Sequence, residues 1–269
     1  MNTEQTILIF SDLDGTILDK ENFSFEEIKP FIKELLIENI HLIPNSSKTK
    51  DEIINFNKDL SEKLPYIVEN GAAIYDLHLI NSSFPEKIIL SREKNEILNI
   101  FNEKVPDKYR SKFRFIDNFD IKTKIETLGL KKDNIKLAMN REFSVPLLFK
   151  GKKKEKDEVF KIIKNLGLSL QEGGRIINLC DNVSKSSAMK KVVKIFEKII
   201  KNKLITIAVG DNYNDLEMLK RSDLPCLVFN DNFTQEKLSI DNCLVSKKSA
   251  PGGWKEIVNL ALDKIKQKD

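Results

Sequence analysis

A short run of branched and aromatic residues, Ile7-Leu8-Ile9-Phe10, is followed almost at once by Asp12-Leu13-Asp14-Gly15-Thr16. A continuous apolar run that ends in a glycine-containing turn is typical of a strand buried on both faces of a parallel sheet. In open α/β sheets, ligands bind at the carboxyl ends of such strands. Two carboxylates at this place can act on one bound group, one as a nucleophile and the other as a general acid. A lone Asp-x-Asp turn is common without any chemistry, so this interpretation needs support from elsewhere in the chain.

The first third of the chain has the alternation expected of a doubly wound sheet. Apolar residues at helical spacing predict a helix over residues 24–39, and Ser24 with Glu27 has the pattern of a capping box. Residues 41–44 predict a second strand, a helix follows through about residue 60, and residues 66–68 predict a third strand. This order predicts an α/β fold built on a parallel sheet.

The middle of the chain differs in charge from the rest. Residues 81–172 contain 21 basic and 14 acidic side chains, a net charge of +7, against −3 elsewhere. Helices alternate here with strand candidates at residues 135–139, 147–149 and 169–171. The core pattern then resumes with a helix at 184–198, a strand at 205–209, a helix starting at 216–219, a strand at 226–229 and a closing helix at 254–265. We predict a core formed by residues 1–80 and 173–269, interrupted by an insert at 81–172.

A second acidic cluster, Gly210-Asp211-Asn212-Tyr213-Asn214-Asp215, follows an apolar strand and precedes a helix. Oxygen-rich side chains at two strand ends suit Mg²⁺, which prefers octahedral oxygen coordination. Taken alone, the cluster is equally well explained as a helix N-cap with acidic residues near the helix dipole. Because both clusters follow apolar strands, we expect them to meet around one divalent cation.

Two further residues complete a possible phosphate site. Ser46 ends the second strand, before a helix whose N-terminal amides can bind an anion, and Lys185 begins the helix after the insert. Each is weak evidence by itself, because a serine at a strand end is usually a cap and a lysine at a helix start usually faces solvent. Their order along the chain is more informative: Asp-x-Asp-Gly-Thr, serine, lysine, then Gly-Asp-x-x-Asn-Asp.

That order resembles the haloacid dehalogenase (HAD) superfamily over the whole chain. The resemblance implies a doubly wound parallel-sheet core with an inserted α+β cap domain. Five segments look more narrowly like signatures of the mannosyl-3-phosphoglycerate phosphatase family: Asn45-Ser46-Ser47-Lys48-Thr49, Val68-Glu69-Asn70-Gly71-Ala72, Arg141-Glu142-Phe143-Ser144, Gly173-Gly174-Arg175 and Pro251-Gly252-Gly253-Trp254. Two departures, at Val183-Ser184-Lys185-Ser186 and Val145-Pro146-Leu147, leave the sugar open between mannosyl and glucosyl.

The resemblance implies a Mg²⁺-dependent phosphatase of mannosylglycerate biosynthesis, a compatible-solute pathway, acting on a sugar-linked 3-phosphoglycerate. Asp12 would be the nucleophile and Asp14 the general acid and base, with Ser46 and Lys185 binding the phosphoryl group. The implied metal site consists of Asp12, Asp14 through its carbonyl, and Asp211, with Asp215 and Asn214 in support. Arginine grips carboxylates with two parallel hydrogen bonds, which favours Arg141 and Arg175 for the glycerate. The full set of implied substrate-binding residues is Lys48, Glu69, Asn70, Arg141, Ser144, Gly174 and Arg175.

Three other functions stay open: a broader sugar-phosphate phosphatase of the sucrose-phosphatase-like or general cap-bearing type, a phosphomutase, and a noncatalytic binding protein on the same scaffold. The net charge of +4 does not favour nucleic-acid binding. The N-terminus lacks the pattern of a signal peptide, and the chain has no apolar run long enough to span a membrane. Three widely separated cysteines favour a reducing compartment. We therefore expect a cytoplasmic enzyme, a monomer or weak homo-oligomer, whose partner is a small phosphorylated glycosyl-glycerate.

Overall fold

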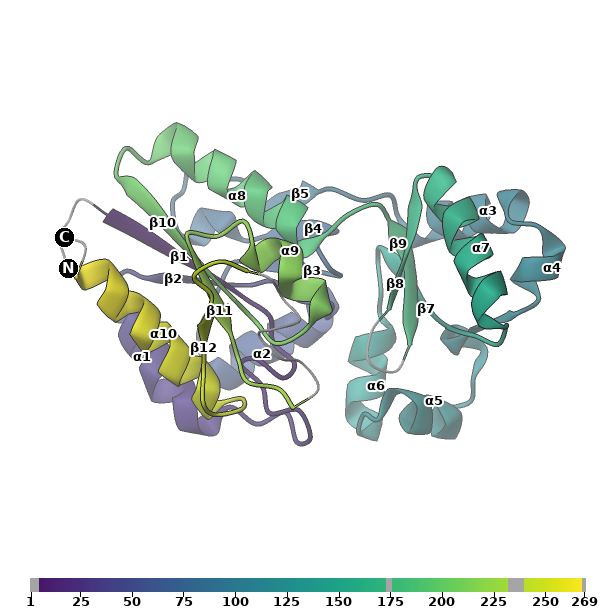
Figure 1. Ribbon diagram of the computed structural model, residues 1–269, viewed down its shortest axis with the longest axis horizontal. Helices are drawn as coiled ribbons and strands as arrows, with labels where there is room; N and C mark the ends of the chain where they lie inside the picture. Colours follow the sequence, from purple (N-terminus) through teal and green to yellow (C-terminus); the bar gives the residue numbers. More distant parts are fainter. Residues whose placement is uncertain (1–4, 173–175, 232–239, 268–269) are drawn as a thin grey trace.

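The computed structural model describes residues 5–172, 176–231 and 240–267. Figure 1 shows two parts, a parallel sheet with helices on both faces and a smaller antiparallel sheet with its own helices. We refer to the first as the core and to the second as the cap. Within the described residues, no helix is both long enough and apolar enough to cross a membrane.

The core sheet has five parallel strands in the order β12-β11-β10-β1-β2. They are β1 (Gln5–Ser11), β2 (His41–Pro44), β10 (Lys203–Gly210), β11 (Leu224–Leu227) and β12 (Leu244–Val245). β1 pairs with β10 from Gln5 against Lys203 to Ser11 against Val209. Because the two strands are parallel and end side by side, the residues that follow them leave the sheet at the same edge. The predicted parallel-sheet fold is confirmed.

The side chains of β1 alternate between two hydrophobic cores. Ile7 and Ile9 belong to the core on one face of the sheet, and Leu8 and Phe10 belong to the core on the other. Burial on both faces explains why the strand is a continuous apolar run. Figure 1 shows α8 above the sheet and α1 and α10 below it. The helices of the core are α1 (Lys29–Ile37), α2 (Lys50–Leu60), α8 (Lys185–Ile199), α9 (Leu216–Leu219) and α10 (Gly252–Lys266).

The predicted helix over residues 24–39 starts later than expected. A single 3-10 turn at Glu26–Ile28 precedes α1, which begins at Lys29 with Pro30 in its first turn. Ser24 does not cap a helix, so the predicted capping box with Glu27 is wrong. Proline fixes the φ angle that a first helical turn requires, and it therefore places the helix start nearer to Pro30 than to the serine.

Residues 66–68 form a strand as predicted, but not in the parallel sheet. β3 (Tyr66–Val68), β4 (Ala73–Tyr75) and β5 (Lys87–Ile89) form a separate antiparallel sheet. The turn between β3 and β4 places Glu69, Asn70 and Gly71 at φ angles of +46°, +59° and +99°. A side chain at Gly71 would place Cβ 2.2 Å from the Ser184 carbonyl oxygen, so the turn packs tightly against the start of α8.

The cap is a four-stranded antiparallel sheet in the order β6-β7-β9-β8. Its elements are α3 (Lys94–Lys104), α4 (Asp107–Arg110), β6 (Phe113–Phe115), α5 (Ile121–Leu128), α6 (Lys132–Met139), β7 (Ser144–Phe149), α7 (Lys153–Asn165), β8 (Leu168–Glu172) and β9 (Ile177–Asp181). The strand predicted at residues 135–139 is wrong, because these residues lie in α6. Its buried residues Ile135 and Ala138 are three apart, which is helical spacing.

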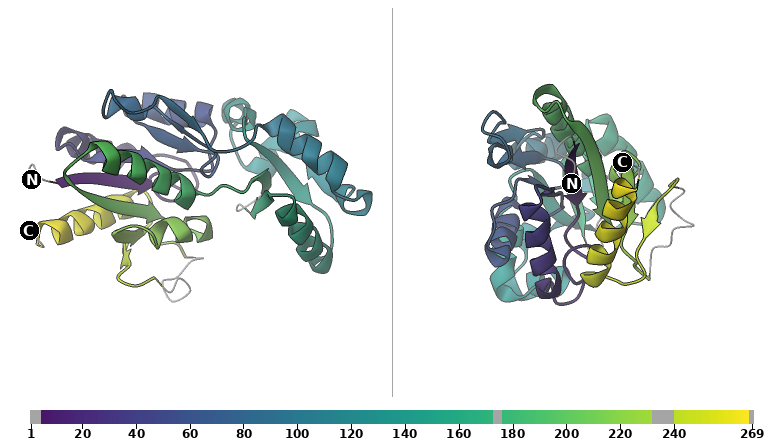
Figure 2. Two further views of the ribbon diagram at one scale, coloured as in Figure 1. Left: turned by 90° about the horizontal axis from the view of Figure 1, so that it is seen from above. Right: turned by 90° about the vertical axis from the view of Figure 1, so that its left-hand side faces the viewer.

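The cap sheet continues past the predicted C-terminal boundary of the insert. β9 lies past residue 172 and pairs with both β7 and β8, so it belongs to the cap sheet. We propose that the cap runs from about residue 91 to residue 181, in place of 81–172. Figure 2 shows, in the view from above, that β1 runs toward the cap. The carboxyl ends of the core strands therefore face the insert.

Candidate active site

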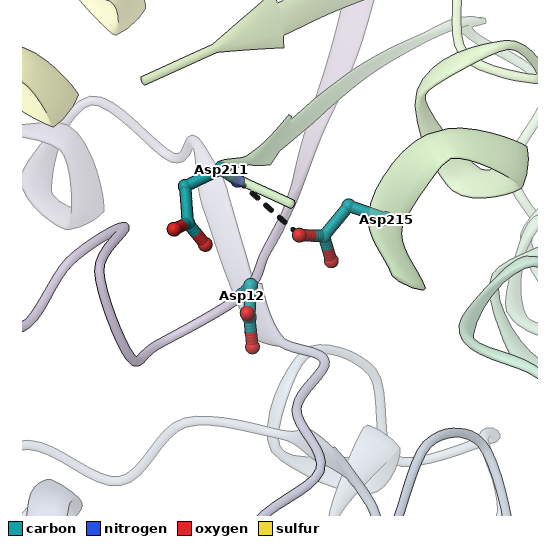
Figure 3. Close-up of side chains that lie close together, drawn as sticks. All are labelled: Asp12, Asp211 and Asp215. Atoms are coloured by element: carbon teal, nitrogen blue, oxygen red, sulfur yellow. Dashed lines mark hydrogen bonds between the residues drawn. The ribbon is translucent and has the colours of Figure 1, made fainter. Parts of the chain in front are cut away.

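Three carboxylates meet at the edge of the core sheet that faces the cap. Asp12 follows β1, Asp211 follows β10, and Asp215 ends the short 3-10 turn Tyr213–Asp215. One ligand atom from each lies within 4.8 Å of the others, and all three residues are buried. Figure 3 shows the three carboxylates gathered at this place. The predicted convergence of the two acidic turns is therefore observed.

Lys185 supplies a positive charge inside this cluster. Its Nζ lies 2.8 Å from Asp12 Oδ1 and 2.7 Å from Asp215 Oδ1, and its side chain is 1% exposed. Burial alone would lower the pKa of Lys185, but the carboxylates of Asp12 and Asp215 raise it overall. The lysine is consequently charged. The start of α8 is held in turn by Asn45, whose Nδ2 donates to the Lys185 carbonyl at 3.0 Å.

The cluster still has excess negative charge. Burial first, then repulsion from Asp215 and Asp12, raises the pKa of Asp211 to about 7. Burial also raises the pKa of Asp215, although Lys185 opposes this. Three carboxylates and one ammonium group carry a formal charge of −2, and every acidic ligand atom is oxygen. Such a site fits a divalent cation that prefers oxygen ligands.

Asp215 and Asp211 differ in the protein groups that donate hydrogen bonds to their carboxylates. Asp215 accepts from Lys185 through Oδ1, and from the amides of Asp211 and Asn212 through Oδ2, both at 3.2 Å. Asp211 accepts from Asn230 Nδ2 at 2.8 Å and from Thr16 Oγ1 at 3.3 Å. Both oxygens of Asp215 thus accept from protein donors, which suits this residue to hold its neighbours in place.

The loop after β1 fits closely around Asp211. Gly15 has φ +75°, and a Cβ added to it would lie 2.7 Å from Asp211 Oδ2. Glycine is required here both by the backbone angle and by this contact. The sequence motif Asp-x-Asp-Gly-Thr is therefore explained by geometry: Gly15 lets the loop turn beside Asp211, and Thr16 donates to it.

Asp14 lines a cleft between the core and the cap with a volume of about 270 Å³. Lys48 Nζ lies 2.9 Å from Asp14 Oδ1, and 42% of the Asp14 side chain is exposed. Burial by the surrounding protein raises the pKa of Asp14, and Lys48 opposes this increase.

Of the predicted substrate residues, two line this cleft. Lys48 does so from the loop before α2, and Arg141 from the segment before β7. Arg141 Nη1 donates to the Ser47 carbonyl at 3.3 Å and to Ser144 Oγ at 3.1 Å. The cap therefore contributes a guanidinium to the same cleft as Asp14.

The other predicted residues are distributed around the site. Ser46 is fully buried, and its Oγ accepts from the Lys48 amide at 3.4 Å. Asn70 is buried beside it, with its amide donating to the Ser46 carbonyl at 2.9 Å. Asn214 is exposed in the turn before α9. Gly174 and Arg175 lie outside the described residues.

Glu69 and Ser144 bind protein groups of the other domain. The Glu69 carboxylate, 3% exposed, accepts from the amides of Glu142 and Phe143 and from the Ser144 hydroxyl. Glu69 belongs to the β3–β4 turn of the core, whereas the three donors belong to the cap. This carboxylate therefore joins the two parts of the molecule.

The sequence did not indicate several residues of the site. Glu52 lines the cleft and lies 3.4 Å from Lys48 Nζ, Asn178 lines it from β9, and Phe23 lies over Lys48 with its ring centroid 5.3 Å from Nζ. Asn230, the donor to Asp211, follows β11. Glu52 could have been recognised in the sequence as a partner of Lys48, because it lies four residues after Lys48, in the first turn of α2. Asn178 could not have been recognised, because an asparagine in a strand is usually structural.

The chain therefore has a parallel α/β core with buried acids at its strand ends and an inserted cap. The chain belongs to the haloacid dehalogenase-like hydrolase family, whose model matches residues 9–247. The predicted superfamily and hydrolase class are confirmed.

The chain is also similar to individual members of this group. A glucosyl-3-phosphoglycerate/mannosyl-3-phosphoglycerate phosphatase from Persephonella marina is 29% identical, over 97% of this chain and 99% of that protein. This similarity supports the narrower resemblance predicted from the sequence signatures.

Solved structures show the same fold at lower identity. A phosphatase of the haloalkanoate enzyme superfamily from Bacteroides thetaiotaomicron has a TM-score of 0.69 at 13% identity, covering 98% of this chain and 96% of that one. A Streptococcus mutans protein has a TM-score of 0.68 at 18% identity, covering 97% and 98%.

Proposed function

We propose that the protein is a Mg²⁺-dependent phosphatase that hydrolyses a glycosyl-3-phosphoglycerate to the glycosylglycerate and phosphate. The main support is the position of Asp12 and Lys185 in a buried acidic cluster. Asp14 lies nearby and lines a cleft that also contains cationic side chains. A nucleophile, a buried charge to offset phosphoryl repulsion and a proton donor are thus present together.

In the proposed first step, an Asp12 carboxylate oxygen attacks phosphorus and the bond to the glycerate oxygen breaks. Asp14, in its protonated form, gives its proton to that departing oxygen. In the second step, Asp14 takes a proton from water, and the water oxygen attacks phosphorus and releases Asp12. Lys185 remains paired with Asp12 and offsets the repulsion between its carboxylate and the phosphate.

The proposed metal ligands are Asp12, the Asp14 carbonyl and Asp211, with Asp215 and Asn214 in supporting positions. Asp215 suits a supporting role because its oxygens already accept three protein hydrogen bonds. Bound Mg²⁺ would polarise the phosphoryl oxygens and lower the cost of bringing a carboxylate to a phosphate dianion.

Two observations support the proposed substrate class, the lining of the cleft and the similarity to a named relative. The cleft combines the cationic groups of Lys20, Lys48 and Arg141 with the apolar surfaces of Phe23 and Leu130. This lining suits an anionic molecule that carries a less polar part, such as a glycosyl phosphoglycerate. The Persephonella marina relative is named for both the glucosyl and mannosyl compounds, and we propose activity on one or both.

The test is a phosphate-release assay with mannosyl- and glucosyl-3-phosphoglycerate, with and without Mg²⁺. We expect Mg²⁺-dependent release from at least one of them, no turnover by Asp12→Asn, and unchanged turnover by Asp263→Asn, which alters an exposed carboxylate on α10. Equal rates on sugar phosphates without a glycerate group would indicate the broader sugar-phosphate phosphatase instead. Turnover by Asp12→Asn would exclude Asp12 as the nucleophile.

A further inference from the structure

The Glu69 carboxylate is buried and is held in place by three hydrogen bonds from the cap. It is 3% exposed, and its turn has three consecutive residues with positive φ. All three groups that donate to it come from one cap segment: the amide of Glu142 at 2.9 Å, the amide of Phe143 at 3.2 Å, and the hydroxyl of Ser144. Charge-assisted hydrogen bonds of this kind are stronger than neutral ones.

The Ser144 hydroxyl continues this network to Arg141. Ser144 is 2% exposed, and its oxygen accepts from Arg141 Nη1 at 3.1 Å. A serine hydroxyl has one proton, which Ser144 donates to Glu69. Its lone pairs are thereby directed toward other donors. The orientation of the hydroxyl, and with it the place of Arg141 Nη1, is therefore set by Glu69.

Among the described residues, the opposite edge of the guanidinium has no protein acceptor. Both hydrogen bonds that Arg141 donates leave from Nη1, to Ser144 and to the Ser47 carbonyl. Nε is buried and has no hydrogen-bond partner in the part of the chain that the structure describes. Nε and Nη2 form the edge of an arginine that matches a carboxylate with two parallel hydrogen bonds. Arg141 also lines the cleft that contains Asp14 and Lys48.

We propose that Glu69 and Ser144 are positioning residues that hold Arg141 so that its Nε–Nη2 edge receives the carboxylate of the bound glycerate. The proposal rests on the proposed function for the identity of that carboxylate. It differs from the sequence-based prediction, in which Glu69 and Ser144 contact the substrate themselves. A free arginine side chain loses rotamer entropy when it binds a ligand, and holding it in place beforehand reduces that cost.

Ser144 offers a matched pair of variants. Ser144→Thr keeps the hydroxyl, whereas Ser144→Val has nearly the same shape without it, and both β-branched residues suit strand β7. For hydrolysis of the glycosyl-3-phosphoglycerate, we expect Ser144→Val to raise KM about tenfold with little change in kcat, because a hydrogen bond to a charged group is lost. Ser144→Thr should have a KM close to that of the wild type. Neither variant should change KM for p-nitrophenyl phosphate, which has no carboxylate.

Binding measurements make this test independent of turnover. We would measure by calorimetry the Kd of 3-phosphoglycerate and of inorganic phosphate for the wild type and both variants. Ser144→Val should weaken 3-phosphoglycerate about tenfold and leave phosphate unchanged. If the protein hydrolyses no glycosyl-3-phosphoglycerate but this binding pattern holds, the proposed function fails and the positioning role stands. Equal behaviour of the two variants, or equal weakening of phosphate, would overturn the positioning role.

Discussion

Lys48 Nζ lies 2.9 Å from Asp14 Oδ1 and 3.4 Å from Glu52 Oε1, so one ammonium group is shared by two carboxylates at the edge of the cleft. Burial raises the pKa of Asp14, and Lys48 lowers it. Burial alone would lower the pKa of Lys48, but Asp14 and Glu52 raise it overall. The lysine therefore stays protonated and favours the ionised form of Asp14, which the second proposed step requires.

Lys48→Met should shift the acid limb of the pH profile of kcat to higher pH. Without the lysine, burial and the charges of Asp12 and Glu52 act on Asp14 unopposed, so its pKa rises further. A higher pH is then needed before Asp14 can accept a proton from water. Lys48→Arg keeps the charge and should leave the limb near its original position. The prediction is wrong if the acid limbs of the Met and Arg variants coincide.

Asp211 should destabilise the protein when no metal is bound. Its pKa is raised from 3.8 to about 7 by burial and then by Asp215 and Asp12. Between these two values the folded protein holds a proton that the unfolded chain has released. The stability of the metal-free protein therefore falls as pH rises through this window. Above it, the cost is on the order of a few kcal/mol.

Asp211→Asn should consequently raise the Tm of the metal-free protein by several degrees at a pH above this window, while abolishing activity. Thr16 and Asn230 can still bond to the amide, because the threonine hydroxyl can turn to accept. Mg²⁺ should raise the Tm of the wild type and not that of the variant. Thermal unfolding in EDTA and in Mg²⁺ tests this; a lower Tm for the variant in EDTA would contradict it.

Lys185→Met should reduce both activity and stability. It leaves Asp12 and Asp215 as buried charges without their shared partner, at a cost of roughly 3–5 kcal/mol of unfolding free energy. Loss of a charge that stabilises the phosphoryl group should lower kcat about 10²- to 10³-fold. Lys191→Met, an exposed lysine on the same helix, is the control. Similar kcat values for the two variants would remove Lys185 from the proposed role.

The sequence predicted the acidic cluster because each of its parts lies at the end of an apolar strand. Strands that are buried on both faces can be recognised in the sequence as continuous apolar runs. Parallel pairing of β1 with β10 then brings Asp12 and Asp211 to one edge of the sheet. No long-range information was needed beyond the order of the strands. Gly15 was predictable for the same reason, since a sharp turn beside a ligand needs a residue without a side chain.

Contacts between the core and the cap were not predictable in this way. Glu69 and Ser144 are 75 positions apart and meet only because the cap returns to the β3–β4 turn. The strand predicted at 135–139 failed because a short apolar run is ambiguous between helix and strand. The helix α6 packs against α5 and α2, and the Leu137 carbonyl accepts a hydrogen bond from Thr49 Oγ1. Tertiary packing decided its structure.

Trp254 connects the closing helix to the proposed nucleophile. Its Nε1 donates to Ser11 Oγ at 3.0 Å, and Ser11 Oγ donates to the Asp12 carbonyl at 2.8 Å. Trp254 is fully buried. Trp254→Phe removes the first donor and leaves space in a packed core, so the free energy of unfolding should fall by about 1–3 kcal/mol.

The effect of Trp254→Phe on kcat should be small, because the Asp12 amide also donates to the Val209 carbonyl at 3.0 Å and fixes the backbone independently. Ser11→Ala separates packing from hydrogen bonding. If Trp254 acts through the hydroxyl, Trp254→Phe should cost less stability in the Ser11→Ala background than in the wild type, because the lost hydrogen bond is counted only once. Chemical denaturation of the four proteins measures this coupling. Strict additivity would mean that Trp254 stabilises the core by packing alone, and that its indole nitrogen contributes nothing to holding Asp12.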